Sequence, residues 1–111
     1  MEKILTFEDF SKVDLRVGTV IKVDDFPEAR KPAYQLTIDF GALGTKKSSA
    51  QITSLYSKTE LVGRQVIAVV NFPKKQIAKF MSECLIIGAV DGKDVILLTP
   101  DVQVMNGAIV K

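Results

Sequence analysis

Residues 15–40, LRVGTVIKVDDFPEARKPAYQLTIDF, contain two stretches in which apolar and polar side chains alternate. The apolar residues stand mainly at odd positions in Leu15–Val23 and at even positions in Tyr34–Phe40. A period of two residues is typical of a β-strand with one buried and one solvated face. Gly18 predicts a bulge or a sharp bend in the first strand, as small barrels require. The stretch therefore predicts two strands of a curved sheet, joined by a charged loop with two prolines.

The rest of the chain continues the strand pattern and adds short helices. Thr6–Val13 has the features of a helix start, and Leu55–Val62 is expected to form a helix that Gly63 ends. Lys46–Ile52 is a polar strand candidate. The remaining expected elements are strands at Gln65–Phe72, Cys84–Val90 and Val95–Thr99, a DGK hairpin turn between the last two, and a small helical element around Gln76–Phe80.

The later strands are apolar on both faces, so both faces need a cover. In a chain of 111 residues one sheet layer cannot supply it, and either a terminal segment or a second chain must do so. Five to six short, mainly antiparallel strands with a helix after the third fit an all-β fold, a small closed barrel of the OB type with an N-terminal helical segment. The length corresponds to one domain.

The composition excludes most catalytic chemistry. The chain has no His and one cysteine, Cys84. Without imidazole there is no Ser-His-Asp triad, no Cys-His dyad and no His metal site, and one cysteine forms neither an intrachain disulfide nor a Cys₄ zinc site. We therefore expect no enzyme activity, no cofactor and no metal. Cys84 is expected to be a buried, quiet thiol, and the acidic cluster Asp24, Asp25 and Glu28 to be solvated.

The N-terminal sequence MEKILTFEDF carries acidic residues where a signal peptide needs a basic start and a long apolar stretch. No apolar run approaches the ~18–20 residues of a membrane-spanning helix. We expect a cytoplasmic protein without membrane insertion.

The net charge of +2 does not by itself indicate nucleic-acid binding, so the arrangement of the basic residues matters. They form three pairs: Arg30–Lys31, Lys46–Lys47 and Lys74–Lys75. In an OB barrel, the loop after strand 1 and the loop between strands 4 and 5 flank a ligand face floored by strands 2 and 3. We expect the pairs to converge there. Donors between them would suit phosphate and 2′-hydroxyl groups: Ser48, Ser49 and Gln51.

Ordinary solvated charges are the alternative interpretation of these pairs. Aromatic side chains that could stack on bases are few, and most are expected in the core: Phe26, Tyr34, Tyr56, Phe72 and Phe80.

Three motifs occur in order: PEARKPAYQLTIDFG at 27–41, SSAQIT at 48–53 and VVNFP at 69–73. With them the chain resembles the tRNA-binding domain family, and within it the CsaA group of export-related chaperones. The likeness runs from about Phe7 to Gly107. The resemblance implies a cytoplasmic OB-fold homodimer, a single domain over residues 1–111 with N- and C-terminal dimerisation segments. Our candidates for the dimer interface are Phe7, Phe10, Val102 and Val104.

The resemblance also implies two binding activities, one for unfolded or pre-secretory polypeptides and one for tRNA through shape and backbone. By position, the RNA-facing motif of the family falls on Lys47, Ser48, Ser49 and Gln51, the VVNFP element contributes Asn71, and a later turn contributes Ser82. Cys84 and Leu85 stand where many tRNA-binding relatives have Gly-Met, which favours the CsaA branch.

The leading hypothesis is a non-catalytic chaperone that binds polypeptides in an apolar groove near a dimer interface, with Lys and Arg at its rim. The alternative is a tRNA-binding auxiliary protein that uses the basic face. The full predicted RNA-binding set is Arg30, Lys31, Lys46, Lys47, Ser48, Ser49, Gln51, Asn71, Lys74, Lys75 and Ser82.

Overall fold

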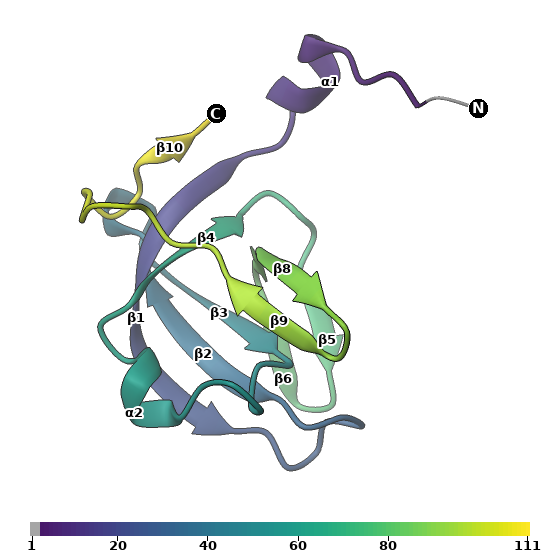
Figure 1. The fold of residues 1–111 in the computed structure, drawn as a ribbon, viewed down its shortest axis with the longest axis vertical. Helices are drawn as coiled ribbons and strands as arrows, with labels where there is room; N and C mark the ends of the chain where they lie inside the picture. Colours follow the sequence, from purple (N-terminus) through teal and green to yellow (C-terminus); the bar gives the residue numbers. More distant parts are fainter. Residues whose placement is uncertain (1–2) are drawn as a thin grey trace.

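The structure, a computed structural model that describes residues 3–111, is built around one strongly curved antiparallel sheet (Figure 1). In chain order its elements are α1 (Phe7–Ser11), β1 (Leu15–Asp25), β2 (Tyr34–Asp39), a 3₁₀ turn (Gly41–Leu43), β3 (Thr45–Ala50), α2 (Lys58–Leu61), β4 (Gln65–Val69), β5 (Lys75–Ile77), β6 (Phe80–Ser82), β7 (Leu85–Ile86), β8 (Gly88–Asp91), β9 (Asp94–Leu97) and β10 (Ile109–Val110).

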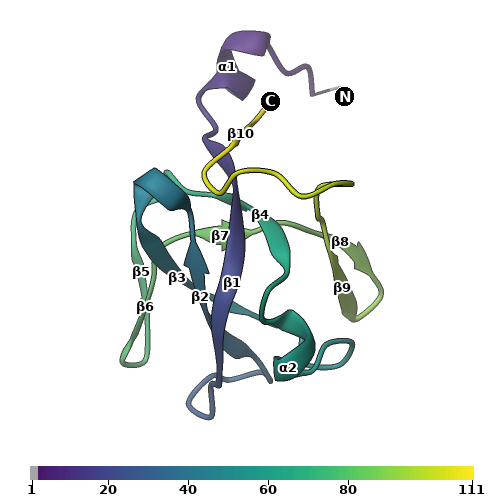
Figure 2. The same ribbon diagram turned by 90° about the vertical axis from the view of Figure 1, so that its left-hand side faces the viewer.

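The strands of the main sheet follow the order β3-β2-β1-β4-β7, with β10 paired to β1. The hairpins β5–β6 and β8–β9 lie on different sides of this sheet (Figure 2). Two hydrogen bonds nearly close the barrel: the Glu83 N–H donates to the Lys47 carbonyl (2.7 Å), and the Lys47 N–H donates to Glu83 Oε1 (3.0 Å). With α2 after β3 and α1 before β1, the predicted OB-type barrel is confirmed.

Gly18 is required by close packing and does not form a bulge. A Cβ at this position would lie 2.6 Å from Ile38 Cγ2 and 2.8 Å from the Phe40 ring. The register of β1 against β2 shifts between Val20 and Lys22 instead. The bulge predicted at Gly18 was therefore wrong in its position, although the strand is bent nearby.

Both helices begin at a side-chain cap, which the sequence predicted for the first helix only. Thr6 Oγ1 accepts a hydrogen bond from the Asp9 N–H at 3.0 Å. Ser57 and Glu60 form a reciprocal capping box at the start of α2, and Gly63 follows the helix with φ of +93°. Both helices are shorter than expected.

The helical element predicted around Gln76–Phe80 was wrong, because this segment forms the β5–β6 hairpin. Ile77 and Phe80 are cross-strand partners on either side of the turn and pack in the same cluster as Phe26. Their i, i+3 spacing therefore comes from a two-residue turn and not from a helix. Ala78 takes a positive φ of 54° in that turn.

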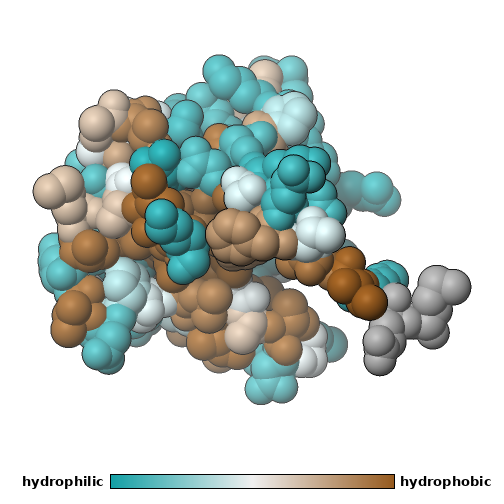
Figure 3. Space-filling view, turned by 90° about the horizontal axis from the view of Figure 1, so that it is seen from above, coloured by the Kyte–Doolittle hydropathy of each residue, from teal (hydrophilic) through white to brown (hydrophobic). Residues whose placement is uncertain are grey.

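The C-terminal segment runs back along β1, where the Gly107 N–H donates to the Val17 carbonyl (2.7 Å) and the Val17 N–H to Ala108 (3.0 Å). Helix α1 stands beyond the barrel at the same end (Figures 1 and 2). Apolar side chains gather on this end, seen from above in Figure 3, and Phe7 is 81% exposed there.

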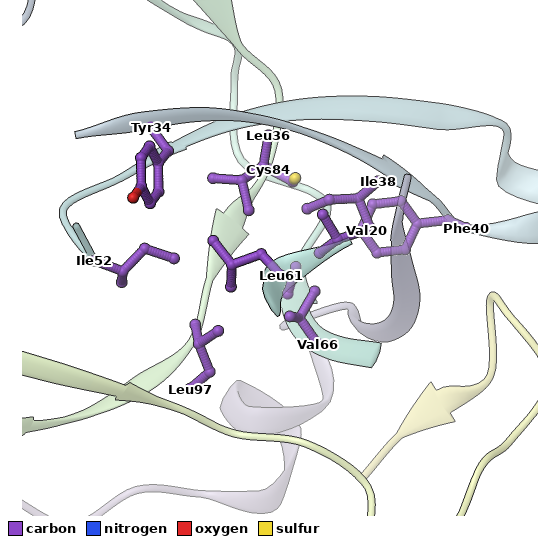
Figure 4. Close-up of a cluster of buried hydrophobic side chains, with 11 residues drawn as sticks. Val20, Tyr34, Leu36, Ile38, Phe40, Ile52, Leu61, Val66, Cys84 and Leu97 are labelled. Carbon is purple, nitrogen blue, oxygen red and sulfur yellow. The ribbon is translucent and has the colours of Figure 1, made fainter. Parts of the chain in front are cut away.

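The core lies inside the barrel and joins strands from both halves of the chain (Figure 4). Its fully buried members include Leu36, Ile38 and Phe40 from β2 and the following turn, and Leu61 from α2. Helix α2 thus closes one end of the barrel with a single apolar side chain. At about 1.5–3 kcal/mol per buried large apolar side chain, this cluster is the main source of stability.

Candidate functional site

An open groove of about 1000 Å³ lies between the loop after β1, the end of β3, strand β5 and strands β7 and β9. Its most deeply buried lining side chains are apolar: Phe26, Ala33, Ile52 and Leu97. Its polar lining residues are Arg30, Lys31, Ser49, Gln51, Lys75 and Gln76. The groove is therefore amphiphilic, with an apolar floor and a rim that is polar and cationic.

The cations of this rim are free to bind an anion. Five ion pairs occur within residues 3–111, and none of them involves Arg30, Lys31 or Lys75. The loop after β1 supplies the first two, and β5 supplies the third. Charge-assisted hydrogen bonds to a carboxylate or phosphate are the strong interactions that such groups can make.

A second, smaller pocket of about 640 Å³ adjoins the groove and shares three lining residues with it: Lys75, Gln76 and Leu85. Its other lining residues are Phe72, Pro73, Lys74, Ser82 and Cys84. We call it the Phe72 pocket, because the half-exposed Phe72 ring forms part of its wall.

Glu83 connects β3 with the loop that carries Lys74. Its Oε1 accepts the Lys47 N–H, and its Oε2 lies 3.6 Å from Lys74 Nζ. The Glu83 side chain is one quarter exposed, while that of Lys74 is two thirds exposed. Glu83 therefore holds the edge of β3 in place and partly neutralises one cation of the Phe72 pocket.

The structure brings together most of the residues predicted for RNA binding. Five line the groove: Arg30, Lys31, Ser49, Gln51 and Lys75. Three line the Phe72 pocket: Lys74, Lys75 and Ser82. Lys47 is exposed on the outer face of β3, opposite Thr37 of β2, and lines neither cavity.

Other predicted residues lie elsewhere. The alternation of β3 turns Lys46 and Ser48 to the side opposite Lys47, and Ser48 is only 1% exposed. Its hydroxyl donates to the Ser49 carbonyl at 3.2 Å and has no surface to offer an RNA. The Asn71 amide accepts the Asp14 N–H and donates to the Lys12 carbonyl, so it fastens the segment after α1 to the barrel.

Cys84 is buried, as predicted. Burial raises the pKa of its thiol to about 12, the largest cause of the shift being desolvation. Sγ lies 3.8 Å from the Lys47 carbonyl, to which the thiol donates. At neutral pH the nucleophilic thiolate is therefore scarcely populated.

Of the five aromatic residues considered for stacking, Phe26, Tyr34 and Phe80 are at most 9% exposed. The Tyr56 hydroxyl accepts the Leu97 N–H, so that ring fixes β9. Phe72, in contrast, is 54% exposed. We expected Phe72 inside the strand Gln65–Phe72, but β4 ends at Val69. Pro73, directly after Phe72, was the signal in the sequence that the strand ends earlier.

An apolar groove with a cationic rim was predicted, but the residues of its floor were not. The floor residues come from three separate segments, the β1–β2 loop, the end of β3 and β9, and in the sequence each one has the pattern of an ordinary core residue. The acidic cluster, as expected, is engaged on the surface: Asp25 pairs with Lys58 (2.8 Å) and Asp24 with Lys22 (3.5 Å).

Within residues 3–111, no group of three His, Cys, Asp or Glu side chains is placed to hold a metal ion. None of the helices in that range is long and apolar enough to cross a membrane.

A barrel with an amphiphilic groove, and with rim cations that form no ion pair among residues 3–111, is typical of a small binding domain. The chain matches the family described as putative tRNA binding domain over residues 15–109, and it belongs to that family. Curated relatives include methionine–tRNA ligases of Thermococcus onnurineus (38% identical over 102 residues) and Pyrococcus horikoshii (39% over 105 residues). These matches cover 92% and 95% of the chain, but the chain spans only 14% of each ligase.

Two solved structures are similar over nearly the whole chain. The chaperone CsaA from Bacillus anthracis str. Ames is 50% identical, with a TM-score of 0.94 over 98% of this chain and 100% of the other. The CsaA chaperone protein from Picrophilus torridus is 54% identical, with a TM-score of 0.92 over 97% and 100%. The resemblance to the tRNA-binding domain family and its CsaA group is thereby confirmed.

Proposed function

We propose that this protein is a non-catalytic binding protein of the CsaA type, a chaperone for unfolded or pre-secretory polypeptides whose basic face also binds tRNA. The observation that carries the proposal is the groove, in which Arg30, Lys31 and Lys75 stand without ion-pair partners among residues 3–111 above an apolar floor. A polypeptide segment with apolar and acidic side chains complements both features. The likeness to two structures described as chaperones supports it.

The size of the groove suits a short polypeptide segment. Its volume of about 1000 Å³ is at the upper end of the usual range for ligand cavities, roughly 300–1,000 Å³. The side chains of Ser49, Gln51 and Gln76 can pair with the peptide backbone of a client, whatever its sequence. Such contacts do not depend on the order of residues in the client, as a chaperone with many clients requires.

The test compares two fluorescent peptides, one with alternating Leu and Glu and one with Lys in place of Glu. We expect the acidic peptide to bind more tightly, because its carboxylates face the groove cations. The double variant Arg30→Gln/Lys75→Gln should remove this preference. Lys93→Gln, in the exposed β8–β9 turn, is the matched control. Equal binding of both peptides to the wild-type protein would refute the polypeptide part of the proposal.

A second candidate function, that of a tRNA-binding auxiliary protein, is favoured by the family match and by the exposed Lys47, two residues before the groove residue Ser49 on β3. Binding through the phosphate backbone falls steeply with salt. Lys47→Gln and Lys75→Gln should each lower the slope of log affinity against log salt by about 0.7–0.9 if the lysine contacts a phosphate. An unchanged slope would mean that these lysines are only solvated, and the function would rest on the polypeptide site.

We also propose that the terminal segments form a homodimer interface. Phe7 and Val102 are 81% and 73% exposed, Val104 is 38% exposed, and Phe10 is half-buried. Obligate homodimers bury more than ~2,000 Å² in total, mostly apolar. Light scattering at micromolar concentration should give the mass of two chains, and Phe7→Glu should give one. A wild-type particle with the mass of one chain would contradict the dimer.

We propose a cytoplasmic location. The one cysteine is a buried free thiol, which suits a reducing compartment. In the cytoplasm a chaperone would meet pre-secretory polypeptides before their export. A pull-down from cytosol, with and without ribonuclease, would separate polypeptide partners from partners that are held through RNA.

A further inference from the structure

Phe72 is an aromatic side chain that the fold leaves at the surface beside cations. It is 54% exposed in the loop after β4, whereas Phe26, Tyr34 and Phe80 are at most 9% exposed. Ligand pockets are lined mainly by apolar and aromatic side chains, and the Phe72 ring forms such a wall.

The residues that follow Phe72 provide the other groups of a single-strand site. Lys74 has two thirds of its side chain exposed, and within residues 3–111 Lys75 has no ion-pair partner. Gln76 and Ser82 add an amide and a hydroxyl to the same pocket. Proteins that bind single-stranded RNA combine these elements: an aromatic face for a base, cations for the backbone, and polar groups for the base edge or 2′-hydroxyl.

The wall of the pocket is mainly apolar, with Phe72, Pro73 and Leu85, while two lysines add cations that a nucleotide can use and an apolar side chain of a client cannot. The Glu83 carboxylate pairs with Lys74 at 3.6 Å, and within residues 3–111 no ion pair involves Lys75. Lys75 also lines the groove, so a strand whose backbone follows the groove cations can place one base in the pocket.

We propose that the Phe72 pocket binds an unpaired nucleobase, stacked on the Phe72 ring, with Lys74 and Lys75 on the flanking phosphates. The inference rests on the tRNA-binding part of the proposed function. It specifies that the protein recognises an unpaired loop or end of an RNA in addition to the backbone of a duplex.

The chain has no Trp, so a single introduced Trp reports directly on stacking. We would titrate Phe72→Trp with a short oligoadenylate RNA and follow the indole fluorescence. The expected result is saturable quenching by the oligoadenylate and little by an abasic oligonucleotide of equal length. Val62→Trp is the matched control and should not respond, because Val62 is half-exposed like Phe72 but lines neither the groove nor the Phe72 pocket.

Affinity measurements separate stacking from general apolar contact. Phe72→Ala should weaken oligoadenylate binding about 5- to 150-fold, the range that corresponds to the loss of one base–aromatic stack. Phe72→Leu should weaken it similarly, and Phe72→Tyr should retain it. The salt slope should not change in any of them, because no charge is removed. Since Phe72 is half-exposed, thermal unfolding should confirm that each variant is folded.

The outcomes are distinguishable. Wild-type binding of oligoadenylate that is unchanged in Phe72→Ala, or fully retained in Phe72→Leu, would overturn the stacked base but leave the tRNA-binding proposal intact. If Phe72→Ala loses binding of the acidic peptide but keeps binding of oligoadenylate, the pocket belongs to the polypeptide site. That result would also overturn the stacked base. If the wild-type protein binds neither tRNA nor oligoadenylate, the tRNA-binding part of the proposed function itself fails.

Discussion

Gln65 fastens the C-terminal segment to the barrel, and its removal should release that segment. Its Nε2 donates to the Val104 carbonyl (2.7 Å) and to Asn106 Oδ1 (3.2 Å), and its Oε1 accepts the Val104 N–H (3.0 Å). The side chain is 8% exposed. Gln65→Leu keeps a similar side-chain volume but removes all three hydrogen bonds.

The cost follows from the number of bonds and the exposure of their partners. A typical intramolecular hydrogen bond contributes about 0.5–1.5 kcal/mol net. Because Val104 is 38% exposed, water can replace part of what Gln65 supplied to its backbone. We therefore expect Gln65→Leu to lower the free energy of unfolding by about 2–3 kcal/mol.

Urea unfolding followed by circular dichroism, at one fixed protein concentration, measures this loss. Hydrogen exchange should show faster exchange of the Val104 amide, which loses its acceptor. Gln76→Leu is the control, since Gln76 is exposed and makes one local hydrogen bond to the Ala78 carbonyl (3.1 Å). A loss below about 1 kcal/mol, or unchanged exchange at Val104, would refute the role given to Gln65.

Three further predictions concern the core, the thiol and the carboxylate beside the site. Gly18→Ala should destabilise the protein by about 1–3 kcal/mol in urea unfolding, because the new Cβ meets Ile38 and Phe40. With a pKa of about 12, Cys84 should react with a thiol reagent at a rate that still rises about tenfold per pH unit above pH 9. A rate that reaches a plateau there would contradict the raised pKa of the buried thiol. Since folding raises this pKa, the thiol's contribution to stability should be complete below the unfolded pKa and fall as the pH rises towards 12. Glu83→Gln keeps an acceptor for the Lys47 N–H but removes the ion pair with Lys74. Binding of tRNA should therefore become tighter, with a steeper salt slope. A weaker affinity in a folded variant would contradict the neutralising role given to Glu83.

The sequence was a good guide where one local pattern has one structural meaning. The alternation in Tyr34–Phe40 predicted a strand with one buried face, and Leu36, Ile38 and Phe40 are indeed completely buried. Alternate side chains of a strand point to the same face, so this pattern has one structural meaning. It was a poor guide where two structures share a spacing. The i, i+3 pair Ile77 and Phe80 fits a helical turn and equally a two-residue hairpin, and only their packing against Phe26 decides between them.

The candidate site divides in the same way. The cation pairs could be found from the sequence, because loops and strand edges expose charged residues. The apolar floor could not, since Phe26, Ile52 and Leu97 become neighbours only when the barrel closes. Phe72 was among the stacking candidates but was expected inside the strand Gln65–Phe72, because an apolar run does not show where a strand stops. The structure ends β4 at Val69, so Phe72 lies in the following loop.

The motif on β3 shows why family resemblance and side-chain geometry must be used together. Consecutive residues of a strand face opposite sides, so a contiguous run cannot have one role. The Lys47 side chain and Ser49 lie on the outer side, whereas Ser48 lies in the interior, where its hydroxyl contacts the Cys84 thiol. The main chain of Lys47 meanwhile closes the barrel through Glu83. A run that resembles a binding motif therefore combines proposed ligand contacts with the hydrogen bonds that close the barrel, and both depend on the same strand.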